Sequence, residues 1–321
     1  MIKEEIKFTF NKFKVLRGVA NNCIKLKIIV FSYEPDKTDM KTTMKFTFLA
    51  LLCMGTATGL KAQGIKMPAA SSEQTIIQDF GLGRITVKYS RPNTKGRTVF
   101  GKMEPYGAVW RTGANSATVI TFTEDVTFAG KPVPAGEYAL FTIPGKEEWT
   151  VILNKTTKQW GAYEYKEADD FLRVRVKAGN GKDKVETFTI DFTDVFPTKA
   201  VMQIAWENTI VKVDLTTDID AKVMASIDEA MKGEKKPYFA AAQYYFENGK
   251  DLNKALEWMN AAEVTDPTGP WTKLWKGRMQ LKNGDKKGAA ESAEAGIKLA
   301  TEAKIPEYIR LNTELLMQAK K

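Results

Sequence analysis

The chain has 321 residues, of which 43% are hydrophobic, and a formal net charge of +9, so it can build two domains with cores of ordinary size. Residues 1–62 hold eleven Lys and Arg against five Asp and Glu, which leaves 37 basic and 34 acidic residues, or +3, for residues 63–321. The charge therefore gives little support to a nucleic-acid partner, and we expect none.

The sequence has no histidine, and its two cysteines, Cys23 and Cys53, both precede residue 63. These absences exclude histidine bases, cysteine nucleophiles, Ser-His-Asp triads, disulfides and zinc sites built from His or Cys from residues 63–321. We expect neither a cofactor nor a metal there.

Residues 40–62 have the layout of a secretory signal peptide. Lys41 and Lys45 precede an apolar run over residues 46–54, and small residues follow. The run is about half of the roughly 20 residues that a membrane-spanning helix needs, which favours a cleaved signal. Leu precedes Cys53 where a lipoprotein signal has a small residue, so lipid anchoring is disfavoured. We expect an exported protein that is periplasmic, outer-membrane-associated or extracellular.

Residues 1–39 lie upstream of this signal, which is an unusual position for a leader. We expect that Met40 or Met44 is the true initiator and that residues 1–39 are an over-extended start. A mature N-terminus before Met40, measured by mass spectrometry of the exported protein, would contradict this expectation.

After a linker over residues 63–74, residues 75–216 alternate apolar and polar positions and are rich in β-branched and aromatic residues. Short segments of this pattern, separated by Gly, Pro and Asp or Asn turns, predict a β-sandwich or an open barrel. The predicted strands cover residues 84–90, 118–123, 137–143, 150–154, 172–177, 187–192, 201–206 and 210–215.

Residues 217–321 change to a helical pattern, beginning with a helix over 220–231. Asp251 and Ala255 recur as Asp285 and Ala289, 34 residues later, which is the tetratricopeptide period. We expect a helical-hairpin domain with two degenerate tetratricopeptide-like repeats. Stacked repeats form concave surfaces that often bind peptides; the alternative is a helical cap on the β domain or a support for a dimer.

The densest group of conspicuous residues lies at 89–118. Arg91, Lys95, Arg97 and Arg111 place four cations within 21 residues, and guanidinium groups suit carboxylate, phosphate or sulfate ligands. In the competing interpretation these cations are solvated or form structural salt bridges, for which the partners would be Glu104, Asp125, Asp169 and Asp170.

The same stretch offers groups for stacking and hydrogen bonding. We predict that Tyr89, Tyr106 and Trp110 contribute aromatic contacts and that Asn115 hydrogen-bonds a ligand. The alternatives are that Trp110 belongs to the edge of the core and that Asn115 adopts a left-handed conformation and bonds its own loop. Downstream, Trp149, Trp160, Tyr163 and Trp206 are further aromatic residues of the kind that stack on carbohydrate.

Several strings of this region, YSRP, KGR, VWRTGANSAT, PAGEYALFTIPG, WTVILN and QWGAYEY, resemble the family of domains of unknown function numbered 2911. The resemblance covers roughly residues 70–215. It implies export in bacteria with an outer membrane, a mostly β fold and, in many members, a tetratricopeptide-like helical tail. It assigns no catalytic residue.

We therefore expect a non-enzymatic binding or envelope-associated module that recognises an anionic or hydroxyl-rich ligand, such as a glycan fragment, a phosphate or a peptide carboxylate, through residues 89–118. Its helical part would contact a protein partner. One alternative is a hydrolase acting on glycans, which needs two carboxylates beside the loop, with Glu104, Asp125, Glu137 and Glu207 as candidates. The other is a purely structural or interaction protein.

Overall fold

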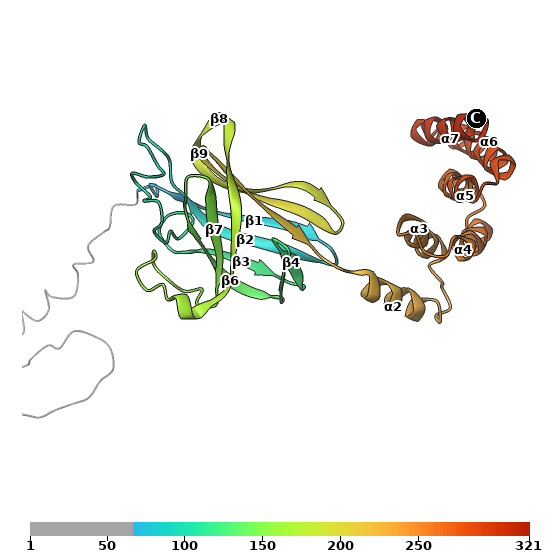
Figure 1. The fold of residues 1–321 in the computed structure, drawn as a ribbon. Coiled ribbons are helices and arrows are strands. Elements are labelled where there is room, and N and C mark those ends of the chain that lie inside the picture. Colours follow the sequence, from blue (N-terminus) through green and yellow to red (C-terminus); the bar gives the residue numbers. More distant parts are fainter. Residues whose placement is uncertain (1–66) are drawn as a thin grey trace, which may run out of the picture. The chain divides into compact units, whose positions relative to one another are not determined.

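The computed structural model describes residues 67–321 (Figure 1). The predicted signal peptide, the predicted start and both cysteines lie outside the described residues, so these expectations stay predictions.

The β domain is one nine-stranded antiparallel sheet, with the strand order β1-β2-β3-β6-β7-β8-β9-β4-β5. The sheet is open and does not close into a barrel, which agrees with the predicted β-rich class. Its strands are β1 (Ser72–Phe80), β2 (Gly83–Arg91), β3 (Thr118–Phe122), β4 (Val126–Phe128), β5 (Lys131–Val133), β6 (Gly136–Ile143), β7 (Glu148–Asn154), β8 (Asp170–Phe196) and β9 (Lys199–Thr216).

Two strands are longer than the alternation predicts. The segments 172–177 and 187–192 both belong to β8, and the segments 201–206 and 210–215 both belong to β9. The pairing of β8 with β9 shifts its register between Asn180 and Val185, where Gly and charged residues interrupt the apolar pattern. The strand β1 begins inside the predicted linker. It is an edge strand in which only Phe80 is buried, so its sequence lacks the apolar alternation that identifies the other strands.

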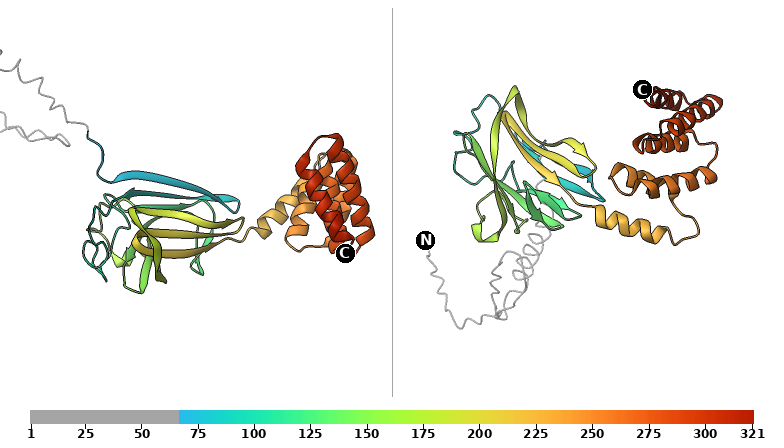
Figure 2. Two further views of the ribbon diagram at one scale, coloured as in Figure 1. Left: turned by 90° about the horizontal axis from the view of Figure 1, so that it is seen from above. Right: turned by 45° about the vertical axis from the view of Figure 1, so that its right-hand side comes forward.

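Strand β8 joins two parts of the sheet into two facing layers. Its first part pairs with β7 and the rest, from Ala178, pairs with β9. The second part then lies against β2, since the hydroxyl of Tyr89 is 3.0 Å from the carbonyl oxygen of Ile190. Figures 1 and 2 show β8 and β9 crossing the face of β1 and β2. The main core, with the fully buried Trp149, Trp206 and Phe188, lies between these layers.

A second, smaller core lies on the outer face of β6 and β7. Leu140 and Leu153 belong to the main core, whereas Phe141 and Ile152 belong to the smaller one, and alternation along a strand puts them on opposite faces. Loop residues that include Val109, Ala162 and Tyr165 cover this outer cluster. The outer faces of the neighbouring strands β2 and β3 carry residues that stay accessible, such as Lys88 and Val119.

The helical part has six helices among the described residues: α2 (Asp220–Ala230), α3 (Tyr238–Glu247), α4 (Leu252–Thr265), α5 (Pro270–Lys282), α6 (Lys286–Glu302) and α7 (Pro306–Ala319). Asp251 caps α4 by accepting hydrogen bonds from the amides of Asn253 and Lys254, and Asp285 caps α6 in the same way from Gly288. Ala255 and Ala289 are fully buried.

The recurrence in the sequence thus has the same local role in both places, since an aspartate cap and a small buried alanine begin α4 and α6. Gly277 of α5 is a further small residue, because a Cβ there would lie 2.7 Å from the Leu315 side chain and 3.2 Å from the Ala289 carbonyl oxygen. Within residues 67–321 no helix is both long and apolar enough to cross a membrane.

Candidate functional site

Tyr89 and Arg91 hydrogen-bond residues 188–190 of β8. The backbone groups that they bond lie on the edge of β8 that does not pair with β9. The Tyr89 hydroxyl accepts a hydrogen bond from the Ile190 amide at 3.0 Å and lies 3.0 Å from the Ile190 carbonyl oxygen. Arg91 Nε donates to the Phe188 carbonyl at 3.0 Å, and its Nη2 donates to the Thr189 hydroxyl at 2.8 Å. Buried backbone groups need such partners, so both side chains have a structural role at this edge. Burial raises the pKa of Tyr89.

The loop after β2 also hydrogen-bonds this edge of β8. The amide of Phe188 donates to the Pro92 carbonyl at 2.8 Å, and the amide of Thr94 donates to the Glu186 carbonyl at 2.9 Å. The Thr94 hydroxyl and the Lys95 amide also bond the Glu186 carboxylate and hold its pKa below the usual range. The backbone of this loop is therefore fixed to β8 on the outer edge of the domain.

Lys95 and Arg97 differ in how their side chains are used. Lys95 is exposed, with φ +48°, and only its amide is bonded within the described residues. Arg97 folds back on its own loop, where Nε donates to the Thr94 carbonyl at 2.9 Å and Nη2 donates to the Asn93 carbonyl at 2.8 Å. Its guanidinium thus holds the turn that Gly96 allows.

Trp110 lies in the main core, with 2% of its surface exposed. Its ring stacks on Trp206 at 5.7 Å and 16° and meets Phe100 and Trp149 edge to face. Its Nε1 donates to the Gly113 carbonyl at 3.1 Å. The core interpretation of Trp110 therefore describes its position, and no face of the ring is open to a ligand.

Asn115 has the left-handed backbone that the sequence suggested, with φ +61°. Its hydrogen bonds do not stay within its own loop, because Nδ2 donates to Ser90 Oγ at 3.2 Å and to the Ser71 carbonyl at 3.3 Å. Gly113 lies close to the same strand, and a Cβ there would be 2.9 Å from the Ser90 carbonyl oxygen. This turn is docked on the end of β2 through long-range contacts.

Tyr106 and Arg111 each have part of the side chain without a partner in the described residues: the exposed part of the Tyr106 ring and the Arg111 guanidinium. Tyr106 is 43% exposed, and its ring lies over Gly101. Arg111 Nε is buried and has no hydrogen-bond partner, and within residues 67–321 the side chain forms no ion pair. Burial raises the pKa of the neighbouring Glu104 to about 7, although the charge of Arg111 lowers it.

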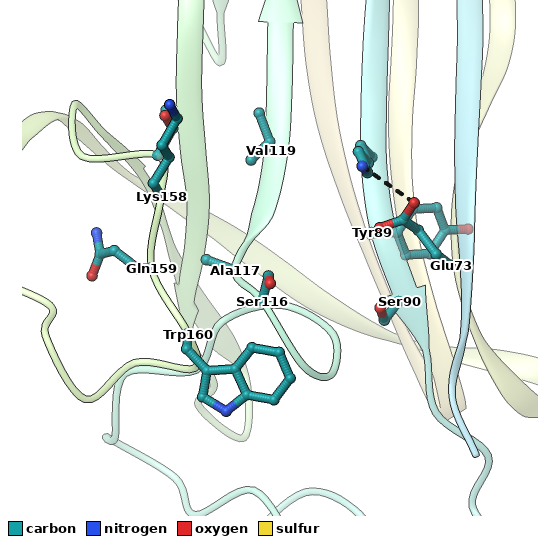
Figure 3. Close-up of a pocket in the computed structure, with 11 residues that line it drawn as sticks. Glu73, Tyr89, Ser90, Ser116, Ala117, Val119, Lys158, Gln159 and Trp160 are labelled. Carbon is teal, nitrogen blue, oxygen red and sulfur yellow. Dashed lines mark ion pairs between the residues drawn. The ribbon is translucent and has the colours of Figure 1, made fainter. Parts of the chain in front are cut away.

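An open groove of about 390 Å³ lies on the outer face of β1, β2 and β3, beside the loop at residues 157–160 (Figure 3). Val119 of β3 lies between the two walls. One wall carries the ion pair of Lys88 and Glu73, at 3.2 Å, and the other carries Lys158 and Trp160. The groove therefore combines an aromatic ring, ammonium groups and hydroxyls.

Trp160 is 65% exposed at the rim of the groove, yet its backbone is fixed. It forms an antiparallel bridge with Ser116, and the amide of Gly161 donates to the Asn115 carbonyl at 3.0 Å. The amide of Ala117 donates to the Gln159 carbonyl at 3.0 Å. The end of the 89–118 stretch thus holds the loop that presents Trp160.

The candidate catalytic carboxylates do not meet in this groove. Glu73 is the one carboxylate that lines it, and it is paired with Lys88. Asp125 accepts a hydrogen bond from the Ala135 amide at 2.8 Å, and Glu207 accepts one from the Val99 amide at 3.1 Å. Across residues 67–321 there is also no group of three Asp, Glu, His or Cys that could hold a metal ion.

Of the predicted binding residues, only Tyr89 lines the groove, through part of its buried ring. No pattern in the sequence singles out four of the groove residues, Glu73, Lys88, Ser116 and Lys158. Trp160 was noted as an aromatic residue, but nothing local distinguishes it from Trp149 and Trp206, which are buried.

Comparison with known families gives one match. Residues 71–215 match the family described as "Protein of unknown function (DUF2911)", which confirms the resemblance drawn from the sequence motifs. No curated protein and no solved structure matches the chain.

Proposed function

We propose that the β domain, which belongs to this family, is a non-enzymatic binding module that takes a hydroxyl-rich ligand, such as a glycan fragment, in the groove beside Trp160. The observation that carries the proposal is the exposed indole of Trp160, fixed through its backbone to Ser116 on the wall of a polar groove.

The chemistry of the groove suits a sugar ring. An indole face offers a flat apolar surface to the C–H groups of a ring, while its surroundings donate and accept hydrogen bonds. Ser116 and Ser90 supply hydroxyls, and Lys158 supplies an ammonium group. A Trp that is 65% exposed leaves apolar area in water, and ligand stacking would remove that area at little entropic cost, since the loop is already ordered.

The same geometry favours binding over glycoside hydrolysis. Hydrolysis with two carboxylates places them about 5 to 10 Å apart across the scissile bond. The groove has one carboxylate, Glu73, which is paired with Lys88 at 3.2 Å, and no second carboxylate lines the groove opposite it. We therefore expect a glycan bound in this groove to be released with its glycosidic bonds intact.

The test is a glycan-array screen of the protein, followed by calorimetric titration with any oligosaccharide that binds. Trp160→Ala should weaken binding at least about ten-fold, which corresponds to about 1.4 kcal/mol. Tyr163→Ala is the matched control, since Tyr163 is an 84% exposed aromatic residue of the same loop that does not line the groove. Equal losses in the two variants, or release of a shortened sugar, would contradict the proposal.

Export of the module is a separate part of the proposal, and it rests on the signal-peptide pattern of residues 40–62. Cell fractionation of the native host should place the protein outside the cytoplasm, with a mature N-terminus after residue 62. Recovery in the cytoplasm with residues 40–62 intact would contradict it.

We further propose that the α3–α7 array contacts a protein partner, which deletion of residues 238–321 should abolish in a pull-down.

A further inference from the structure

Arg111 differs from the other two arginines of residues 89–118. Arg91 donates to the Phe188 carbonyl and the Thr189 hydroxyl, and Arg97 donates to two carbonyls of its own loop. Arg111 makes no side-chain hydrogen bond or ion pair with any residue in the described range, and its Nε is buried. A guanidinium has five N–H donors, and a buried donor without a partner destabilises the fold.

The surroundings of Arg111 bring its guanidinium to the loop that carries Trp160. A Cβ at Gly161 would lie 3.5 Å from Arg111 Nη1. The same Cβ would lie 2.8 Å and 2.9 Å from two ring atoms of Tyr163. Because Gly161 has no side chain, the guanidinium and the Tyr163 ring both approach this backbone segment closely.

Glu104 is an acidic group whose pKa is raised by burial and lowered, to a smaller extent, by the charge of Arg111. The two side chains form no ion pair. Burial raises the pKa of Glu104 to about 7, so near neutral pH a large share of this carboxyl carries a proton. The positive charge of Arg111 is therefore left available in a partly desolvated site, where it attracts an anion more strongly than on open surface.

We propose that Arg111 anchors an oxyanion-binding site between the loops at residues 104–117 and 157–165. The oxyanion is a carboxylate or phosphate group, which a guanidinium binds through two parallel N–H···O bonds. The site is separate from the groove, since Arg111 does not line it. It does not depend on glycan binding.

The test is an NMR titration of the folded protein with sodium acetate and, in a second arm, with inorganic phosphate at constant ionic strength. The backbone amide of Gly161 and the Nε–Hε signal of Arg111 should shift and saturate in the millimolar range. The anion that saturates at the lower concentration identifies the group as a carboxylate or a phosphate.

Three variants make the result specific to Arg111. Arg111→Gln should raise the midpoint of the Gly161 shift at least ten-fold. Arg111→Lys, which keeps the charge but loses the paired donors, should raise it less. Arg175→Gln is the control, because Arg175 is a 78% exposed arginine that also loses one charge and should leave the titration unchanged.

Two outcomes would overturn the proposal: shifts that never saturate in the unaltered protein, or equal midpoints for the unaltered protein and Arg111→Gln. If Arg111→Gln does not fold, an unchanged midpoint in Arg111→Lys overturns it in the same way. Trp160→Ala separates this site from the groove, since it should remove glycan binding and preserve the anion titration.

Discussion

Arg91 and Arg111 carry the same guanidinium within one stretch of chain, yet their surroundings differ. Arg91 bonds the edge of β8 together with Tyr89, whereas Arg111 has no partner among the described side chains. We call residues 89–97 the edge seal, and residues 104–117 with 157–165 the rim. One dense string of unusual residues can therefore bond the backbone of a distant strand at one end and leave a guanidinium without a protein partner at the other.

The largest expected effect comes from Trp110, the rim residue whose ring packs on Phe188 of β8 in the main core. Trp110→Ala should lower the free energy of unfolding by about 3 to 5 kcal/mol, because it empties a site enclosed by aromatic rings. Urea denaturation measures the loss. A loss below about 1 kcal/mol would show that the ring does not support the core.

A smaller loss should follow from the edge seal. Tyr89→Phe keeps the ring but leaves the amide and carbonyl of Ile190 without their side-chain partner, at a cost of about 1 to 3 kcal/mol. The measurement is again urea denaturation, now paired with hydrogen exchange of the Ile190 amide, which should speed up. Unchanged exchange would mean that another group satisfies this edge.

The rim should respond to pH through Glu104. Its pKa in the folded protein is raised from 4.5 to about 7, so the folded state favours the protonated form. The stability that this group contributes is full below about pH 4.5 and is lost as the pH rises through about 7. Glu104→Gln should therefore remove about 1 to 2 kcal/mol of the decline between these pH values, after allowance for its partial exposure.

The check is denaturation of both proteins at a series of pH values. The unaltered protein and Glu104→Gln should have similar stability at pH 4, should diverge between about pH 4.5 and 7, and should differ most above pH 7, where the variant is the more stable. Parallel curves across the whole range would contradict the predicted ionisation of Glu104.

The smallest effect on stability should come from the most exposed part of the rim. Trp160→Ala removes a side chain that is 65% exposed, so the free energy of unfolding should change by no more than about 0.5 kcal/mol. A change above about 2 kcal/mol, read from the same urea curves, would show that Trp160 belongs to the fold in the way that Trp110 does.

Most of the fold follows from local patterns in the sequence. Alternation identified the strands from β2 onward, except the three-residue β4 and β5, and the recurrence of Asp251 and Ala255 predicted the helical hairpins that those residues cap and pack. The predicted linker, residues 63–74, overlaps the start of β1 at Ser72, because β1 is an edge strand whose outward residues look like those of a loop.

The site follows from the sequence only in part, since its contacts join residues far apart in the chain. Tyr89 and Arg91 hydrogen-bond residues that are 101 and 97 positions away in the chain. No spacing within residues 89–118 indicates that a distant strand has backbone groups in need of hydrogen-bond partners. Trp160 is exposed because of where its loop lies over β3, and Trp206 is buried because β9 turns it inward. These are properties of the assembled sheet.

The edge seal also bears on self-association. A strand of 27 residues such as β8, if its outer edge were bare near Phe188 and Ile190, would offer a row of unpaired amides and carbonyls to a second molecule, and such edges begin fibrous aggregates. Two side chains from β2 and one turn of loop occupy those groups instead. The hydrogen bonds of Tyr89, Arg91 and Pro92 therefore leave fewer free backbone groups on this edge for a second molecule to pair with.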